Sequence, residues 1–217
     1  MFTSKVFQNR PFTYLPAKFL LFGLFFYVGL ELITAGLLTY GQGYSVEQQT
    51  VVLCLRLTEL IGFALLIWKY KVFESLGFGK PNQAAVLVFI QVSAACLLAV
   101  GVLYVVHPPL FSYVRLPSWL SGMQGLFLMV VLAPIVEEII FRGLLYRMLR
   151  ERWGILVSVV VSAVFFSMVH HGLLVSPQLL GGIIFALAYE WSRSLWVAIA
   201  LHMGANVAVY VLSVLDI

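Results

Sequence analysis

Charged residues are scarce in this 217-residue chain. Only 10% of its residues are charged and 62% are apolar, whereas an ordinary soluble domain has about 25% charged residues. Its two cysteines, Cys54 and Cys96, lie far apart in apolar runs, which excludes a disulfide framework or a cysteine-based metal motif. Alternating strand patterns are also missing, because the apolar runs are continuous and rich in leucine. The composition therefore predicts an integral membrane protein of the all-α class.

Hydrophobic segments set the expected architecture, since a helix needs about 20 residues to cross the hydrocarbon core. They predict a polytopic bundle of about seven transmembrane helices in a single membrane domain, residues 1–217. The first segment is longer than the apolar region of a signal peptide, so we expect it to be a retained helix. The fifth and sixth segments are short. The seven segments lie at about 19–40, 51–68, 84–106, 122–146, 154–171, 177–191 and 195–214.

Lysine and arginine fall mainly in alternate connections between these segments. The opposite connections contain only Arg115, and Arg56 lies inside the second segment. The positive-inside rule then predicts a cytoplasmic amino terminus and an outer carboxyl terminus. Because the basic residues flank membrane segments and form no single patch, the sequence favours the lipid bilayer over nucleic acid as a partner. The residues on the cytoplasmic side are Lys5, Arg10, Lys18, Lys69, Lys71, Lys80, Arg142, Arg147, Arg150, Arg152 and Arg193.

Ionisable side chains inside the apolar segments are the strongest functional signal, because they are costly in lipid and are usually retained for a purpose. Two adjacent glutamates, Glu137 and Glu138, lie in the fourth segment. One group is in the carboxy-terminal half of the chain, and a second is in the first two segments. The first group is Glu137, Glu138, Arg142, His170, His202 and Asn206; the second is Glu31, Arg56 and Glu59.

Residue spacing predicts how the first group is arranged. Segments four and five should form a hairpin at Trp153-Gly154, which places Glu137 and His170 at nearly the same depth. Glu138 and Arg142 are four residues apart and share a helix face, so we expect them to form an ion pair. Glu137 is rotated from that face by about 100° and is the freer carboxylate, which suits a general base.

Small residues should let the helices of this group approach each other. Gly181-Gly182 and Gly204 lack side chains in the sixth and seventh segments. We expect close helix–helix contacts at these positions, around the polar group.

Three motifs carry a family resemblance. Glu137-Glu138-x-x-x-Arg142, Phe166-x-x-x-His170 and His202-x-x-x-Asn206 resemble the signature of the CAAX protease and bacteriocin-processing family of intramembrane proteases. The similarity covers roughly residues 120–210, the expected catalytic core, and includes the segment 181–206. Residues 1–119 are then peripheral transmembrane helices.

The resemblance implies an intramembrane endopeptidase of a bacterial inner membrane, acting on a membrane-associated protein or peptide. In this interpretation Glu137 activates water, with Glu138 and Arg142 in support and His170 assisting. His202 and Asn206 would stabilise the oxyanion.

Several alternatives stay open. Glu137, His170 and His202 could be three zinc ligands, but no H-E-x-x-H pair is present, and asparagine is a better oxyanion donor than zinc ligand. The sequence therefore favours a reaction without a cofactor. A non-enzymatic immunity or scaffold protein and a proton-coupled carrier are the competing functions, although a carrier should show repeated halves. Glu138 with Arg142, and Arg56 with its two glutamates, could also be purely structural ion pairs. The oligomeric state stays open.

Overall fold

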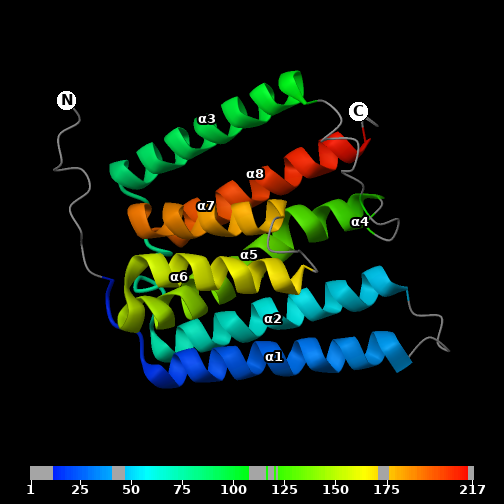
Figure 1. The fold of residues 1–217 in the computed structure, drawn as a ribbon. Helices are drawn as coiled ribbons and strands as arrows, with labels where there is room; N and C mark the ends of the chain where they lie inside the picture. The colour runs from blue at the N-terminus through cyan, green and yellow to red at the C-terminus, as the bar shows by residue number, and fades with distance from the viewer. Residues whose placement is uncertain are drawn as a thin grey trace.

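The computed structural model describes residues 12–40, 47–107, 122–170 and 176–214, and the single residues 116 and 120. All regular structure in these ranges is helical, which confirms the all-α class (Figure 1). The elements are α1 (Ala17–Tyr40), α2 (Gln48–Tyr70), α3 (Gln83–Val106), α4 (Gly122–Phe127), the π-helical η4 (Leu128–Leu132), α5 (Ala133–Glu138), the π-helical η5 (Ile139–Tyr146), α6 (Arg147–Val169), α7 (Pro177–Ser192) and α8 (Leu195–Val214).

Five of the helical segments are long and apolar enough to cross a membrane, so the protein is a multi-pass integral membrane protein. This number differs from the predicted seven for two reasons. The longest candidate, Gly122–Val169, contains the predicted fourth and fifth segments, and α7 has only 16 residues. The predicted hairpin is present, because Gly154 leaves helical geometry at φ 75° and ψ −177°. Only glycine adopts such angles readily, so the chain reverses there.

Local sequence signals explain where two of the helices begin. The Asn82 side chain accepts a hydrogen bond from the backbone N–H of Ala85 and caps α3. Ser176 caps α7 in the same way through the N–H of Leu179, and Pro177 follows at the start of that helix. A proline there sacrifices no hydrogen bond, because the first N–H groups of a helix have no partner within it.

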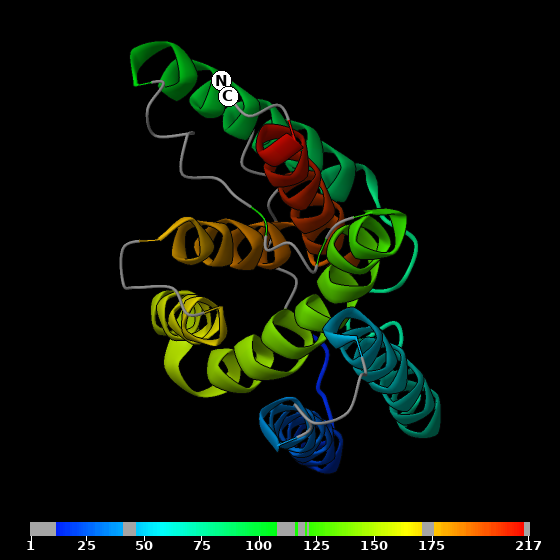
Figure 2. The same ribbon diagram turned by 90° about the vertical axis from the view of Figure 1, so that its right-hand side faces the viewer.

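The helices pack so that α5 lies inside the bundle. Helices α1 and α2 lie side by side, α7 contacts both α6 and α8, and α3 packs on α7 and α8 at the edge. Viewed from the side, the helix formed by residues 122–146 crosses between the α1–α2 pair and the α7–α8 pair (Figure 2). Helix α5 therefore contacts α2 on one side and α8 on the other.

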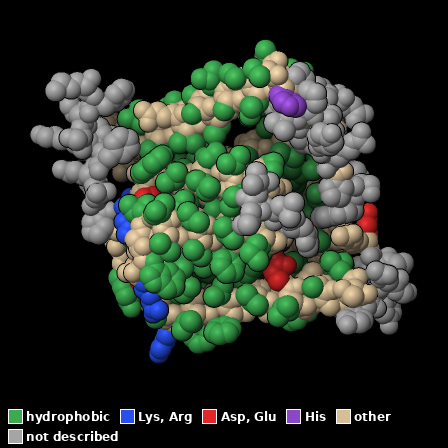
Figure 3. All heavy atoms as spheres, viewed as in Figure 1, with side chains coloured by type: hydrophobic (Ala, Val, Ile, Leu, Met, Phe, Trp, Pro, Cys, Tyr) green, Lys and Arg blue, Asp and Glu red, His purple; other side chains and the backbone are tan. Residues whose placement is uncertain are grey.

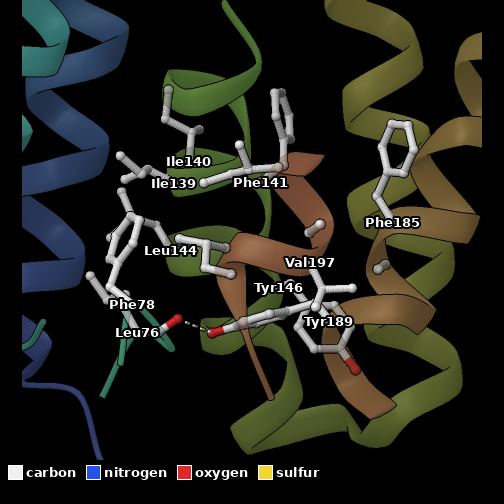
Figure 4. Close-up of a cluster of buried hydrophobic side chains, with 14 of the residues drawn as sticks. Leu76, Phe78, Ile139, Ile140, Phe141, Leu144, Tyr146, Phe185, Tyr189 and Val197 are labelled. Atoms are coloured by element: carbon white, nitrogen blue, oxygen red, sulfur yellow. Dashed lines mark hydrogen bonds between the residues drawn. The ribbon is translucent and has the colours of Figure 1, made fainter. Parts of the chain in front are cut away.

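Aromatic and aliphatic side chains fill the core at the end of the bundle where α5 continues into η5 (Figure 4). Tyr189 is fully buried, and its hydroxyl donates to the Leu76 carbonyl at 2.9 Å. The connection between α2 and α3 is held against the α7–α8 turn by two further bonds, from the Leu195 N–H to the Gly77 carbonyl and from the Trp196 ring N–H to the Phe78 carbonyl. These bonds close one end of the bundle.

Basic side chains gather at that same end, at the left of the space-filling view, where α1 begins and α2 ends (Figure 3). This placement agrees with the predicted orientation, although Lys5, Arg10 and Arg115 lie outside the described residues. Arg147 departs from the expectation of a cytoplasmic charge, because its side chain is fully buried. It donates to the backbone carbonyls of Ser75 and Thr13 and so fastens the chain before α1 to the bundle.

Candidate active site

The acidic pair lies on a short α-helical stretch between two π-helical ones. Helix α5 ends at Glu138, η4 precedes it and η5 follows it. Both glutamates are buried, with 7% of Glu137 and none of Glu138 exposed. A π-helix is rare and often marks a functional site, so the backbone is irregular on both sides of the two carboxylates.

Glu138 joins three elements through one oxygen. Its Oε1 accepts from Arg142 Nη1 at 2.9 Å and from His202 Nδ1 at 2.9 Å. Arg142 in turn donates through Nη2 to the Gly182 carbonyl at 3.0 Å. The predicted Glu138–Arg142 pair is therefore present, and it also ties η5 to α7 and α8.

Glu137 faces both histidines of the predicted group. Its Oε2 lies 3.4 Å from His170 Nε2 and 3.7 Å from His202 Nε2. The first distance confirms that the hairpin brings Glu137 and His170 to the same depth. A third of the His170 side chain is exposed, whereas His202 is 4% exposed. His170 therefore lies at the edge of the site and His202 lies inside it.

Two aromatic rings shape the surroundings of these polar groups. Phe185 stacks on His202, with ring centroids 4.8 Å apart and planes 21° apart. Phe166 lies 4.6 Å from the His170 ring, and its own ring is 4.9 Å from the Arg142 guanidinium carbon. The packing role expected for Phe166 is confirmed. The rings limit the orientations available to the two imidazoles.

Asn206 lies one helical turn beyond His202 but binds elsewhere. Its Nδ2 donates to the backbone carbonyl of Met129 in η4 at 2.8 Å. The amide has two N–H donors, so one is engaged with the backbone and one is left. Asn206 therefore links α8 to the helix that carries the acidic pair, which the sequence did not predict.

The hydrogen-bond partners define the tautomers of both histidines. His170 Nδ1 faces the Phe166 carbonyl at 2.8 Å, and His202 Nδ1 faces the Glu138 carboxylate at 2.9 Å. Both partners are acceptors, so each Nδ1 must carry a proton. The Nε2 of each neutral ring is then a lone pair directed at Glu137. Three acceptors that face one another can be satisfied by the protons of a water molecule or by protonation of one ring.

The same three residues were the candidate zinc ligands. Their atom types suit zinc, and a ligating histidine commonly has its other nitrogen hydrogen-bonded in this way. In the described ranges, however, no three side chains of His, Cys, Asp or Glu are placed so that they would hold one ion. The donor types therefore fit zinc but the arrangement does not, and no step below involves a metal.

Some site features could be read from the sequence and others could not. Gly182 is a close contact as predicted, because a Cβ there would lie 2.9 Å from Ala163 Cα. The same expectation is wrong for Gly204, where a Cβ would have nothing within 4 Å. Phe185 and the carbonyls of Gly182 and Met129 were missed. Phe185 has no periodic signal in so apolar a helix, and backbone acceptors leave no mark in a sequence.

The second polar group also forms as a unit. Arg56 lies 2.6 Å from Glu59, three residues along α2, and 3.0 Å from Glu31 on α1. Glu59 is fully buried and Glu31 is one-third exposed. This ion triad joins α1 to α2 inside the apolar bundle.

Comparisons with known proteins agree with the motifs. Residues 117–208 match the family model described as type II CAAX prenyl endopeptidase Rce1-like. The resemblance expected from the sequence is thus confirmed over the part of the chain that holds all three motifs.

Two curated bacterial relatives cover the same part of the chain. The Staphylococcus aureus protein named "Membrane-embedded CAAX protease MroQ" is 29% identical over 98 residues, which is 42% of this chain and 40% of the relative. The Bacillus subtilis protein named "Putative membrane peptidase YdiL" is 32% identical over 101 residues, 43% of this chain and 40% of the relative. The match thus spans about two fifths of the length of these relatives. No solved structure matches the chain.

Proposed function

We propose that this protein is an intramembrane endopeptidase that hydrolyses a peptide bond of a membrane-associated protein or peptide. The observation that carries the proposal is the convergence of Glu137, His170 and His202. One carboxylate oxygen faces an imidazole nitrogen from each of two other helical elements at 3.4 and 3.7 Å. A scaffold protein has no need to direct three buried acceptors at one point, since unsatisfied polar groups are costly in a membrane.

Glu137 is the proposed general base. A water molecule between Glu137 and the two imidazoles would donate its protons to these acceptors, and its oxygen would be free to attack a carbonyl carbon. In the attack, the water proton passes to Glu137 while the C–O bond forms. The proton then goes to the amine nitrogen as the C–N bond breaks, which leaves a carboxylic acid and an amine. His170 orients the water through Nε2.

His202 is the proposed oxyanion donor, together with Asn206. Because Nδ1 of His202 already holds a proton toward Glu138, Nε2 can donate only when the ring is an imidazolium. The Glu138 carboxylate at 2.9 Å balances that charge, and Arg142 holds Glu138 in place. Asn206 contributes its second amide N–H. One such donor in a preorganised site contributes about 3–4 kcal/mol to the transition state.

The test is hydrolysis by purified protein. Clients are first identified by comparing membrane proteomes of cells that produce the wild type or Glu137→Gln. Glu137→Gln, which keeps the side-chain shape, should abolish cleavage of the client in proteoliposomes while the thermal unfolding midpoint is retained. Glu47→Gln is the matched control, because Glu47 is exposed and makes no capping bond at the start of α2. Its turnover should equal that of the wild type.

Two outcomes would contradict the proposal. Full turnover by Glu137→Gln would remove the base from the mechanism. Retention of the cellular phenotype by both Glu137→Ala and His202→Ala would instead favour a non-enzymatic immunity or scaffold protein. We also propose that no metal takes part, so chelator-treated protein should keep its turnover and contain less than one zinc per chain.

A further inference from the structure

Pro134 leaves a backbone carbonyl of the catalytic helix without a helical partner. In η4 the N–H of Ala133 donates to the Leu128 carbonyl, five residues earlier. The Met129 carbonyl therefore cannot use the Ala133 N–H, and the next donor in this register would be residue 134. That residue is a buried proline, which has no N–H. Within the helix, both donors in reach of Met129 are thus spent or missing.

Asn206 supplies the missing donor from another helix. Its Nδ2 donates to the Met129 carbonyl at 2.8 Å. In a membrane interior, a carbonyl without a partner costs several kcal/mol because no water is at hand. Neighbouring helices commonly satisfy the groups that a proline frees. The freed carbonyl and the amide therefore form a specific attachment between η4 and α8.

The attachment lies next to the reacting groups. Asn206 follows His202 by one turn of α8, and Pro134 precedes Glu137 by three residues. Helix α8 is thus bonded twice to one continuous helix, by His202 to Glu138 and by Asn206 to Met129, at 2.9 and 2.8 Å. Two bonds from successive turns fix both the rotation of α8 and its position along the partner helix.

We propose that Pro134 is a positioning residue: it frees the Met129 carbonyl so that Asn206 can hold α8, and with it His202, in register against Glu137. This inference rests on the proposed function only for its effect on catalysis. The attachment itself is a property of the fold. Asn206 then has two tasks, one amide N–H for the backbone and one for the oxyanion.

A double-mutant cycle tests the attachment without any substrate. Pro134→Ala restores an N–H that can serve the Met129 carbonyl, so the Asn206 amide is no longer needed there. Asn206→Ala should lower the unfolding midpoint of the wild type in detergent by about 2–4 °C, and by less than half as much in the Pro134→Ala background. Equal losses in both backgrounds would overturn the attachment. Should Asn206→Ala not fold, Asn206→Asp enters the same cycle, because it keeps the shape and loses the donor.

Pro177→Ala is the matched control. Pro177 lies at the start of α7, where its missing N–H frees no carbonyl. The effects of Pro177→Ala and Asn206→Ala on the midpoint should simply add, as they do for distant sites. Coupling of similar size in this control would show that the effect is not specific to Pro134.

Kinetics test the positioning role. Pro134→Ala should lower kcat about 10- to 100-fold, as a small misplacement of reacting groups does, while KM for the client stays within about twofold of the wild type. A proline with only a structural role would change the unfolding midpoint and leave kcat unchanged, and that result would overturn the proposal. If the wild type itself hydrolysed nothing, the proposed function would fail, and the double-mutant cycle would still decide the attachment.

Discussion

At the scale of single residues, Glu138 organises the polar interior. One of its oxygens accepts from both Arg142 and His202, and neither Glu138 nor Arg142 is exposed at all. Removal of one partner from a buried ion pair leaves an uncompensated charge, which destabilises far more than loss of a surface pair. The pair is therefore a structural requirement for the imidazole beside it.

Arg142→Met tests this dependence. It keeps a long apolar side chain but leaves Glu138 without a cation, so the free energy of unfolding should fall by about 3–5 kcal/mol, measured by unfolding in mixed micelles. Arg152→Met is the control, because Arg152 is exposed five residues after the buried Arg147. Its effect should stay within about 0.5 kcal/mol. Equal losses in the two variants would show that Glu138 does not need Arg142.

At the scale of elements, the contact of α7 with α6 supports the site. A Cβ at Gly182 would lie 2.9 Å from Ala163 Cα and 3.0 Å from its Cβ, so the two helices touch backbone to backbone. The Gly182 carbonyl is also the acceptor for Arg142 Nη2. Any side chain at this position must push α7 away from α6 and lengthen that hydrogen bond.

Gly182→Ala should therefore destabilise the protein by about 1–3 kcal/mol, the usual cost of overpacking, and should lower turnover. Gly181→Ala is the neighbouring control, because a Cβ there meets only the Phe185 ring, at 3.4 Å, and alanine favours the helix. Ala163→Gly combined with Gly182→Ala should recover much of the loss in the unfolding midpoint. No recovery in this double variant would place the damage elsewhere.

At the scale of the whole molecule, the bundle has one basic end (Figure 3). Lys18, Lys69 and Lys71 are exposed there, around the connections that Arg147 and Tyr189 hold together. Basic residues stay on the cytoplasmic side of a membrane. This end, with the turn at Gly154, should therefore face the cytoplasm.

Cysteine labelling tests that orientation. In a background with Cys54→Ser and Cys96→Ser, Lys71→Cys and Glu47→Cys place one exposed thiol at each end of α2. An impermeant maleimide added to intact spheroplasts should label Glu47→Cys and leave Lys71→Cys unlabelled until the membrane is opened. The reverse pattern would show that the amino terminus is outside and would invert the orientation.

Much of the site could be predicted from the sequence, because depth in a membrane follows directly from position along a helix. Glu137 and His170 are equally far from the Gly154 turn, so their proximity at 3.4 Å needed only the hairpin. The Glu138–Arg142 pair followed from spacing alone. The number of spans was not predicted correctly, since α7 is an apolar helix of only 16 residues.

The sequence by itself determined that this protein lies in a membrane, that it is helical, and which polar residues share a depth. Scarcity of charge and the length of apolar runs are sufficient for that, since water and lipid separate such residues without reference to the fold. Only the tertiary structure decided that His202 binds Glu138 through one nitrogen and faces Glu137 with the other, and that Asn206 reaches the Met129 carbonyl. Those contacts depend on how each helix is rotated about its axis. Close packing at Gly182 and the missing N–H of Pro134 set that rotation, and in a uniformly apolar sequence no periodic pattern records it.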